Sequence, residues 1–155
     1  MLQKKRLKLQ WSSLILNKNK IPIRKKWGQN FLIDNNTIDK IIALINPQTN
    51  QTLIEIGPGQ GAMTNKIAKL AKKLHAVEID PLLYEKLIND NIPNLTLYND
   101  DILKWNLNNK LKCSKVFGNI PYNISSQIIF KFLKDKYCKT MIFMLQKELA
   151  DRITS

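Results

Sequence analysis

Short apolar runs alternate along this chain with segments whose apolar residues recur at helical spacing. An apolar run of strand length predicts a strand covered on both faces, and the periodic segments predict amphipathic helices. The predicted strands span 53–56, 76–80, 95–98, 115–118 and 141–145. Because strands that alternate with helices are joined by right-handed crossovers, the pattern predicts an α/β fold: a doubly wound, mostly parallel sheet with helices on both faces.

Capping residues predict where the helices begin. Asp34, Asn35 and Asn36 are N-cap candidates for a first helix. Asp80 can cap a later helix that Pro81 begins, since proline is tolerated at the first helical position. The side chains expected to face inward are Ile38, Ile41, Ile42 and Ile45 in the first helix, Met63, Ile67, Leu70 and Leu74 in the second, Leu83, Tyr84, Leu87 and Ile88 in the third, and Ile124, Ile128 and Phe132 in the fourth.

Polar or glycine-rich segments stand at the ends of four predicted strands, where an open parallel sheet binds its ligands. Gly57, Gly59 and Gly61 let the backbone pass close beneath a ligand, and the helix that follows offers free N–H groups. Glu78 lies 21 positions after Gly57, a spacing that suits a carboxylate accepting both ribose hydroxyls. Asp101 is placed to accept from the exocyclic amine of an adenine, although an aspartate at a strand end is also a common cap. These residues predict a nucleoside site.

A dinucleotide site is the first alternative, because Gly57-x-Gly59-x-x-Ala62 matches the pattern of nicotinamide-binding turns. Pro58 argues against it, since proline removes an N–H group that a pyrophosphate would use. An oxidoreductase also gives no reason for the segment Asn119-Ile-Pro-Tyr122 after the fourth strand.

That segment carries the specific chemistry. A purine's exocyclic amine is a poor nucleophile because its lone pair is delocalised into the ring. The Asn119 side-chain oxygen and the Ile120 carbonyl can accept both amine hydrogens, which favours a pyramidal nitrogen with its lone pair aimed at a methyl sulfonium. Pro121 fixes the backbone, and Tyr122 offers a face on which the target base can stack. Positioning and charge would supply the rate without a general base. The alternative is an Asn-Pro-Tyr turn that only opens a helix.

Five segments with this chemistry occur in order along the chain. They are Gly28-Gln-Asn-Phe-Leu32, Glu55-Ile-Gly-Pro-Gly59, Glu78-Ile-Asp80, Gly118-Asn-Ile-Pro-Tyr-Asn-Ile124 and Met144-Leu-Gln-Lys-Glu148. Together they resemble the ribosomal RNA adenine dimethyltransferase family. The resemblance implies a Rossmann-like methyltransferase fold, S-adenosylmethionine as the methyl donor, and the transfer of two methyl groups to adenines of small-subunit ribosomal RNA.

The resemblance also implies roles for individual residues. These are Asn30 and Leu32 closing over the donor, Gly57 beneath its methionine part in the Gly57–Gly59 turn, Glu78 on its ribose, Asp101 on its adenine, and Asn119 between the donor and the target amine. Position 120 is Ile where the family usually has Leu, and we expect no consequence because only the backbone of that residue is needed.

The match covers residues 25–155, and family members continue into two further strands and a helical domain that grips RNA. The resemblance therefore implies an incomplete methyltransferase domain, with its apolar fifth strand at an exposed edge. We expect such a chain to bind the donor weakly and to methylate RNA poorly by itself. Residues 1–24 are expected to be a disordered basic extension, with a transit peptide as the alternative.

The charge supports a nucleic-acid partner. The net charge is +13, and nine basic residues lie within residues 1–26, which suits binding to a phosphate backbone. The chain has 22 Lys and only 3 Arg, however, and an AT-rich genome would produce the same bias. No apolar run approaches the roughly 18 residues that a membrane span needs. We expect a cytoplasmic monomer that acts on the precursor of the small ribosomal subunit and has no membrane partner.

The cysteines and the histidine limit other chemistries. Cys113 and Cys138 are far apart in the sequence and form no C-x-x-C motif, so we expect reduced thiols and neither a disulfide framework nor a metal site. His75 is the single histidine, which argues against a catalytic triad and a histidine-ligated metal. We therefore expect no metal cofactor.

Three other functions stay open at the level of sequence. The antibiotic-resistance methylases that act on large-subunit ribosomal RNA share these motifs. A non-catalytic, RNA-binding ribosome-assembly factor could keep the same fold. Methylation of a glutamine amide in a protein uses a similar Asn-Pro-Tyr arrangement but leaves the basic N-terminal segment unexplained.

Overall fold

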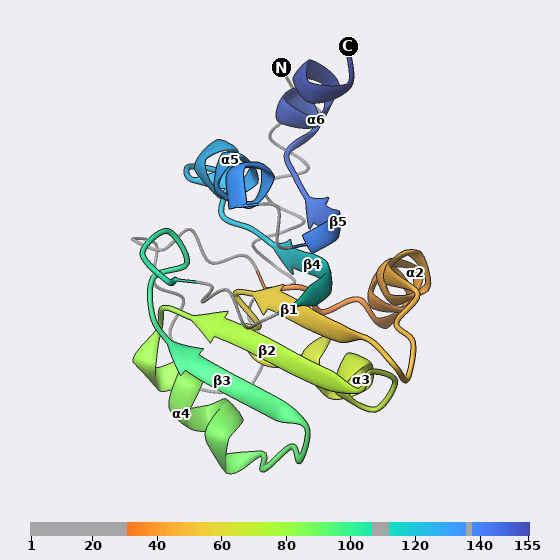
Figure 1. The fold of residues 1–155 in the computed structure, drawn as a ribbon, viewed down its shortest axis with the longest axis vertical. Helices are drawn as coiled ribbons and strands as arrows, with labels where there is room; N and C mark the ends of the chain where they lie inside the picture. Colours follow the sequence, from red (N-terminus) through yellow and green to blue (C-terminus); the bar gives the residue numbers. More distant parts are fainter. Residues whose placement is uncertain (1–30, 107–111, 136–137) are drawn as a thin grey trace.

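Five parallel strands form one sheet in the order β3-β2-β1-β4-β5 (Figure 1). The computed structural model describes residues 31–106, 112–135 and 138–155, so Asn30 and the expected extension 1–24 lie outside the described residues. The strands are β1 (Thr52–Ile56), β2 (Lys73–Glu78), β3 (Leu95–Asn99), β4 (Cys113–Asn119) and β5 (Cys138–Met144). Each pair of neighbours is parallel, which confirms the predicted fold class.

The described helices are α2 (Asn35–Ile45), α3 (Thr64–Ala68), α4 (Pro81–Asn89), α5 (Ser125–Asp135) and α6 (Lys147–Thr154). α2 and α4 begin where their capping residues predict. The Asp34 carboxylate accepts from the Thr37 N–H at 2.8 Å and so caps α2. The Asp80 carboxylate accepts from the Leu82 N–H at 3.0 Å and caps α4, whose first residue is Pro81. Both caps satisfy donors that the helix itself leaves unpaired.

Helices cover both faces of the sheet. Successive side chains of a strand point to opposite faces, so Leu53 and Ile54 of β1 belong to different clusters of the core. One cluster joins Leu53 to Ile38 and Ile45 of α2 and to Ile67 and Ala68 of α3. The other cluster joins Ile54 and Ile56 to Ile128 and Phe132 of α5. The two-sided arrangement predicted from the apolar strands is therefore confirmed.

The second predicted helix is much shorter than its apolar spacing indicated. α3 ends at Ala68, Leu70 is 44% exposed, and Leu74 is a fully buried residue of β2. The Gln51 carbonyl accepts from the Lys72 N–H at 3.0 Å and draws the chain toward β1, so β2 begins earlier than predicted. Leu74 would be buried in either conformation, which is why its spacing from Met63 was misleading.

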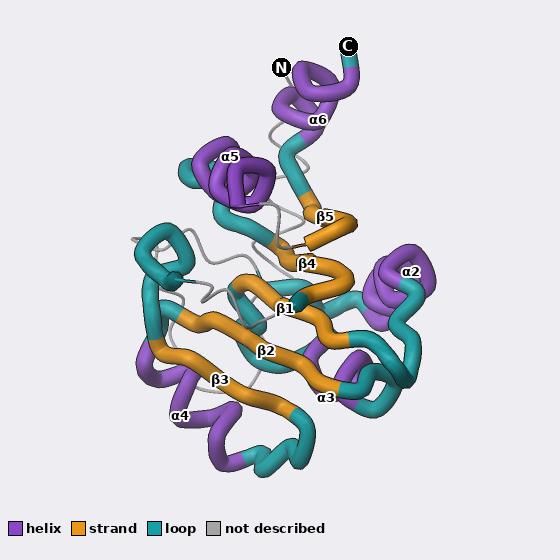
Figure 2. Tube along the Cα trace, in the orientation of Figure 1, coloured by secondary structure: helices purple, strands orange, loops and turns teal. Residues whose placement is uncertain are grey.

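β5 lies at an edge of the sheet, as expected, since among the described strands it is hydrogen-bonded only to β4. α6 follows it and projects away from the sheet with no buried residue (Figure 2).

The prediction that Ile88 of α4 faces inward is wrong, because its side chain is 47% exposed. Within the described ranges, no helix is both long and apolar enough to cross a bilayer.

Candidate active site

A pocket of about 90 Å³ opens at the carboxyl ends of β1, β2 and β4. The predicted site residues that line it are Leu32, Gly57, Gly59, Glu78, Asn119 and Pro121. It is also lined by Phe31, Pro58, Gln60, Ala62, Met63, Ile79 and Leu83. Three other predicted site residues, Asp101, Ile120 and Tyr122, do not line it. The fold thus joins most of the predicted residues, from four separate parts of the sequence, around one cavity.

The turn after β1 is built from glycines in the left-handed region of backbone space. The φ angles are 63° at Gly57, 60° at Gly59 and 86° at Gly61. A Cβ atom at Gly61 would lie 2.7 Å from the Leu87 Cδ2 atom, so this glycine lets the turn pack against α4. A Cβ atom at Gly57 would meet nothing within 4 Å. Gly57 is therefore needed for its φ angle, and the space above it is open.

Glu78 ties the two turns of the pocket together. One of its carboxylate oxygens accepts from the Gly59 N–H at 3.0 Å, and the other accepts from the Asp80 N–H at 2.9 Å. Burial raises the pKa of Glu78, and these two backbone hydrogen bonds oppose the rise. Each carboxylate oxygen has a second lone pair. The carboxylate can therefore hold the turns and still accept hydrogen bonds from a ligand.

Glu55 is a buried carboxyl group beside this pocket. Its side chain is fully buried in β1, and neither of its oxygens has a hydrogen-bond partner of normal geometry among the described residues. Burial and, to a smaller extent, the charge of Glu78 raise the pKa of Glu55, and Thr64 partly opposes the rise. The resulting pKa is about 8. Glu55 is therefore mainly protonated at neutral pH, because an isolated carboxylate is costly to bury.

The predicted methyl-acceptor corner follows β4. Asn119 is the last residue of β4 and lies in register with Met144 of β5. Ile120 is buried, and Tyr122 is 59% exposed just outside the pocket lining. The Pro121 carbonyl accepts from the Ser125 hydroxyl at 2.8 Å, which joins the corner to the start of α5. The corner thus presents one polar side chain to the cavity and one aromatic ring to solvent.

Asp101 begins a turn after β3. Its carboxylate accepts from the Leu103 N–H at 3.0 Å, and its backbone carbonyl accepts from the N–H groups of Lys104 and Trp105. This is the capping geometry that the sequence left open as the alternative. The contact with a donor adenine stays a prediction. Groups of three or more potential metal ligands are absent from the described part of the chain.

Two residues of the site were missed at the level of sequence. Ile79 lines the pocket between Glu78 and Asp80 and is 41% exposed, so it offers an apolar surface to a ligand. Gly118 lets β4 approach β1, since a Cβ atom there would lie only 2.5 Å from the Ile56 carbonyl oxygen. A glycine within a strand is a recognisable signal of such an approach.

The sequence model of ribosomal RNA adenine dimethylases matches residues 20–155 of this chain. The chain belongs to this family. It is 43% identical over 143 residues to the ribosomal RNA small subunit methyltransferase A of Borreliella afzelii, covering 90% of this chain and 50% of that protein. It is 44% identical over 143 residues to the protein of that name from Vibrio atlanticus, covering 85% and 51%. The chain thus spans about half the length of the curated relatives that it matches.

Solved structures agree with this membership of the dimethylase family. A dimethyladenosine transferase from Plasmodium falciparum superposes with a TM-score of 0.71 and 31% identity, over 79% of this chain and 45% of that chain. The 23S rRNA methyltransferase ErmE superposes with a TM-score of 0.70 and 30% identity, over 78% and 50%. Both the family and the Rossmann-like methyltransferase fold predicted from the motifs are confirmed.

Proposed function

We propose that this chain is the donor-binding part of an S-adenosylmethionine-dependent enzyme that dimethylates N6 of adenines in small-subunit ribosomal RNA. The observation that carries the proposal is the convergence of Gly57, Glu78 and Asn119 on one pocket. The names of the family and of its small-subunit relatives support the choice of reaction and RNA. We further propose that the protein acts as a cytoplasmic monomer on the precursor of the small ribosomal subunit.

The lining of the pocket offers groups that suit such a donor. The open space above Gly57 gives room for its methionine part, and the buried Glu78 carboxylate can accept from ribose hydroxyls. Ile79 can pack against the adenine ring, and Asp101 can accept from the amine of that ring. Leu32 lines the cavity and would close over the donor together with Asn30. When bound, the donor supplies an electrophilic methyl group on a sulfonium centre.

The residues at the end of β4 and just after it would prepare the acceptor. The side-chain oxygen of Asn119 and the carbonyl of Ile120 accept the two hydrogens of the target amine, which concentrates its lone pair on nitrogen. Tyr122 is exposed and can stack on the flipped base. Each transfer forms one N–C bond and breaks one S–C bond, and the amine proton passes to solvent. Two rounds convert the amine into a dimethylamine.

Asn119→Ala tests the proposal. We expect the variant to lose methyl transfer by on the order of 100-fold or more, because positioning supplies most of the rate. The assay follows labelled methyl groups from the donor onto purified small-subunit ribosomal RNA, with digestion to nucleosides to identify dimethyladenosine. Asn123→Ala is the matched control, since Asn123 is exposed and lies only four positions further along the chain. Label on protein, or equal transfer by the native chain, Asn119→Ala and Asn123→Ala, would rule out the proposed reaction.

Donor binding provides the second readout, because we expect this chain to methylate slowly by itself. Isothermal titration calorimetry should detect S-adenosylmethionine binding that Gly57 and Glu78 support. A folded chain that ignores the donor at millimolar concentration would instead support a non-catalytic, RNA-binding assembly factor.

Large-subunit RNA is a second candidate substrate. The superposition on the 23S rRNA methyltransferase ErmE, at 30% identity, favours it specifically. The same assay with purified large-subunit RNA decides between the two, since the preferred RNA will accept label at a lower enzyme concentration.

A further inference from the structure

The two cysteines, far apart in the sequence, are neighbours in the sheet. Cys113 begins β4 and Cys138 begins β5, and the two are in-register partners of the parallel pair. In-register partners on adjacent strands lie about 4.8 Å apart and point their side chains to the same face. Cys113 is 6% exposed in the cluster beneath α5, and Cys138 packs against that cluster. Both cysteines are free thiols, as the sequence predicted, but their separation along the chain did not indicate that they are neighbours in the sheet.

The spacing of the pair suits a covalent bond. Disulfides join residues whose Cα atoms lie about 4.4–6.8 Å apart, a range that includes the separation of neighbouring strands. The Cys113 thiol donates to the Lys115 carbonyl at 2.8 Å and also interacts with the Cys138 thiol. Among the described strands β5 lies at the edge of the sheet, so a small shift toward β4 breaks no second ladder of hydrogen bonds between them.

We propose that Cys113 and Cys138 form an oxidation site, at which an intramolecular disulfide fastens the edge strand β5 to β4. The bond would close a loop that contains α5 and would anchor β5, which among the described strands pairs with β4 alone. Both cysteines begin their strands, whereas Asn119 ends β4, so the site lies at the opposite end of the strand from the pocket. The disulfide is thus independent of the proposed methyl transfer.

The reaction is thiol–disulfide exchange with a low-molecular-weight disulfide such as oxidised glutathione. The more exposed Cys138, as a thiolate, attacks one glutathione sulfur, forms a mixed disulfide and releases a glutathione thiolate. The Cys113 thiolate then attacks the Cys138 sulfur and releases the second glutathione thiolate. Two cysteine thiols are oxidised, one glutathione disulfide is reduced, and the two protons lost by the cysteines are taken up by the released thiolates. The Cys138 thiol and burial both raise the pKa of Cys113, so we expect the second step to be slow.

The experiment uses the full, reduced chain, which has only these two cysteines. The folded protein is incubated with oxidised glutathione, free thiols are counted with a maleimide reagent, and a protease digest is mapped by mass spectrometry without reductant. We expect both thiols to be lost, the mass to fall by two hydrogen atoms, and one peptide pair to link Cys113 to Cys138. The unfolding midpoint should rise by on the order of 5–10 °C and return on addition of a reductant.

Two variants separate the steps. Cys113→Ser should accumulate a stable glutathione adduct on Cys138, because no resolving thiol remains. Cys138→Ser should keep its buried thiol unmodified while folded, and it should react only in guanidinium chloride. A stable adduct on the unmutated chain, disulfide-linked dimers, or two thiols that persist at high glutathione disulfide would overturn the proposal. Donor binding by the oxidised chain, measured by calorimetry, should match that of the reduced chain.

Discussion

At the scale of single residues, the surroundings strongly control the protonation state of Glu55. It is fully buried in the central strand, its oxygens lack partners of normal geometry among the described residues, and its pKa is raised to about 8. Among the described residues, the charged neighbour that acts on it is Glu78, which carries the same sign. A charge at this position would thus be opposed by desolvation and by repulsion together.

Glu55→Gln should remove a pH dependence from the stability of the fold. The pKa of Glu55 is raised from 4.5 in the unfolded chain to about 8 in the folded one, so the unfolded state binds fewer protons between these pH values. The contribution of Glu55 to the free energy of unfolding is therefore fully present below about pH 4.5 and is lost as the pH rises toward 8. Glutamine cannot ionise, so the variant should be more stable by about 3 kcal/mol at pH 7.

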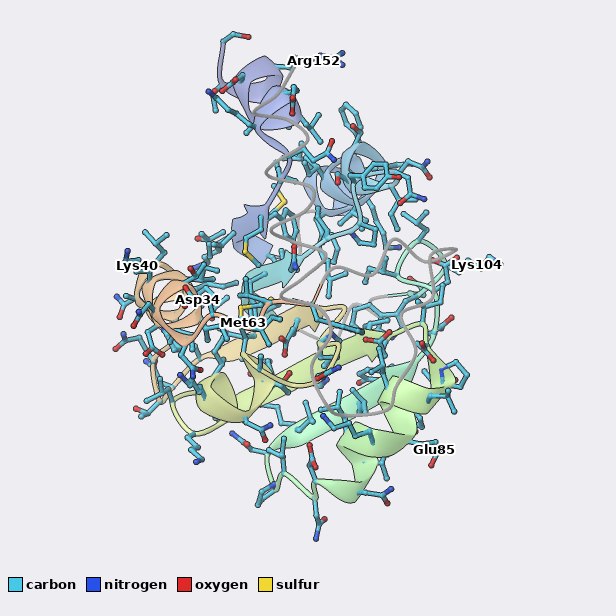
Figure 3. All side chains as sticks on the ribbon, turned by 180° about the vertical axis from the view of Figure 1, so that it is seen from behind. Asp34, Lys40, Met63, Glu85, Lys104 and Arg152 are labelled. Atoms are coloured by element: carbon cyan, nitrogen blue, oxygen red, sulfur yellow. The ribbon has the colours of Figure 1, made fainter. Side chains whose placement is uncertain are left out.

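Thermal unfolding between pH 4.5 and 8 measures this difference. The curves for the native chain and Glu55→Gln should coincide near pH 4.5 and diverge with rising pH. Glu78 also has a raised pKa and should leave a smaller fall of the same sign in the variant. Glu85→Gln is the control, since Glu85 is exposed on the outer side of α4 (Figure 3). Parallel curves for the native chain and Glu55→Gln would contradict the assigned protonation.

At the scale of elements, the glycine turn between β1 and α3 has two separable roles, one in packing and one in ligand binding. Gly61 allows close packing on α4, because a Cβ atom there would clash with the Leu87 side chain. Gly57 has open space around it and faces the pocket. Both need positive φ angles, which cost an L-residue about 1–2 kcal/mol. The same local conformation thus supports the fold at one position and a ligand at the other.

Alanine at each position should separate these roles. Gly57→Ala should lower the unfolding free energy by about 1–2 kcal/mol, from backbone strain alone, and should weaken donor binding about tenfold or more because its methyl group occupies the open space. Gly61→Ala should lose more stability, since the Leu87 side chain must also move. Chemical denaturation and calorimetry with S-adenosylmethionine provide the two measurements. Unchanged donor affinity in a folded Gly57→Ala protein would place the donor elsewhere.

At the scale of the whole molecule, the two notable features are the net positive charge and the length of the chain relative to its relatives. The chain carries a net charge of +13 and spans about half the length of its curated relatives. Seven basic residues and no acidic residue lie within residues 1–24. Lysines that contact phosphates release counterions, so charge-driven RNA binding weakens steeply as salt is added. A compositional bias without a binding role would not produce that dependence.

Removal of residues 1–24 should reduce the salt dependence of RNA binding. If the chain neutralises six or more phosphates, its affinity for small-subunit RNA should fall by roughly 1,000-fold between about 50 and 200 mM salt. The shortened chain should bind more weakly at low salt and show a shallower slope, while its donor affinity stays the same. Fluorescence anisotropy with labelled RNA over a salt series measures both slopes. Equal slopes would assign the N-terminal charge to compositional bias.

Much of the architecture was accessible from local patterns. The caps at Asp34 and Asp80 and the presence of five strands follow from short-range rules of helix and strand formation, and the structure confirms them. The length of α3 was not accessible, because Leu74 is apolar and buried whether it continues a helix or begins β2. Apolar periodicity reports burial, and hydrogen bonds to β1 decided the conformation.

The candidate site divides in the same way. The order of motifs determined the family and the strand ends at which polar groups stand, because those features depend on residue identity and on the handedness of crossovers. Only the tertiary structure decided which groups share a pocket, that Glu55 is buried without hydrogen-bond partners of normal geometry, and that Cys113 and Cys138 are neighbours. Strand register and the partners of a buried side chain arise from contacts between distant segments, and no local pattern in the chain encodes them.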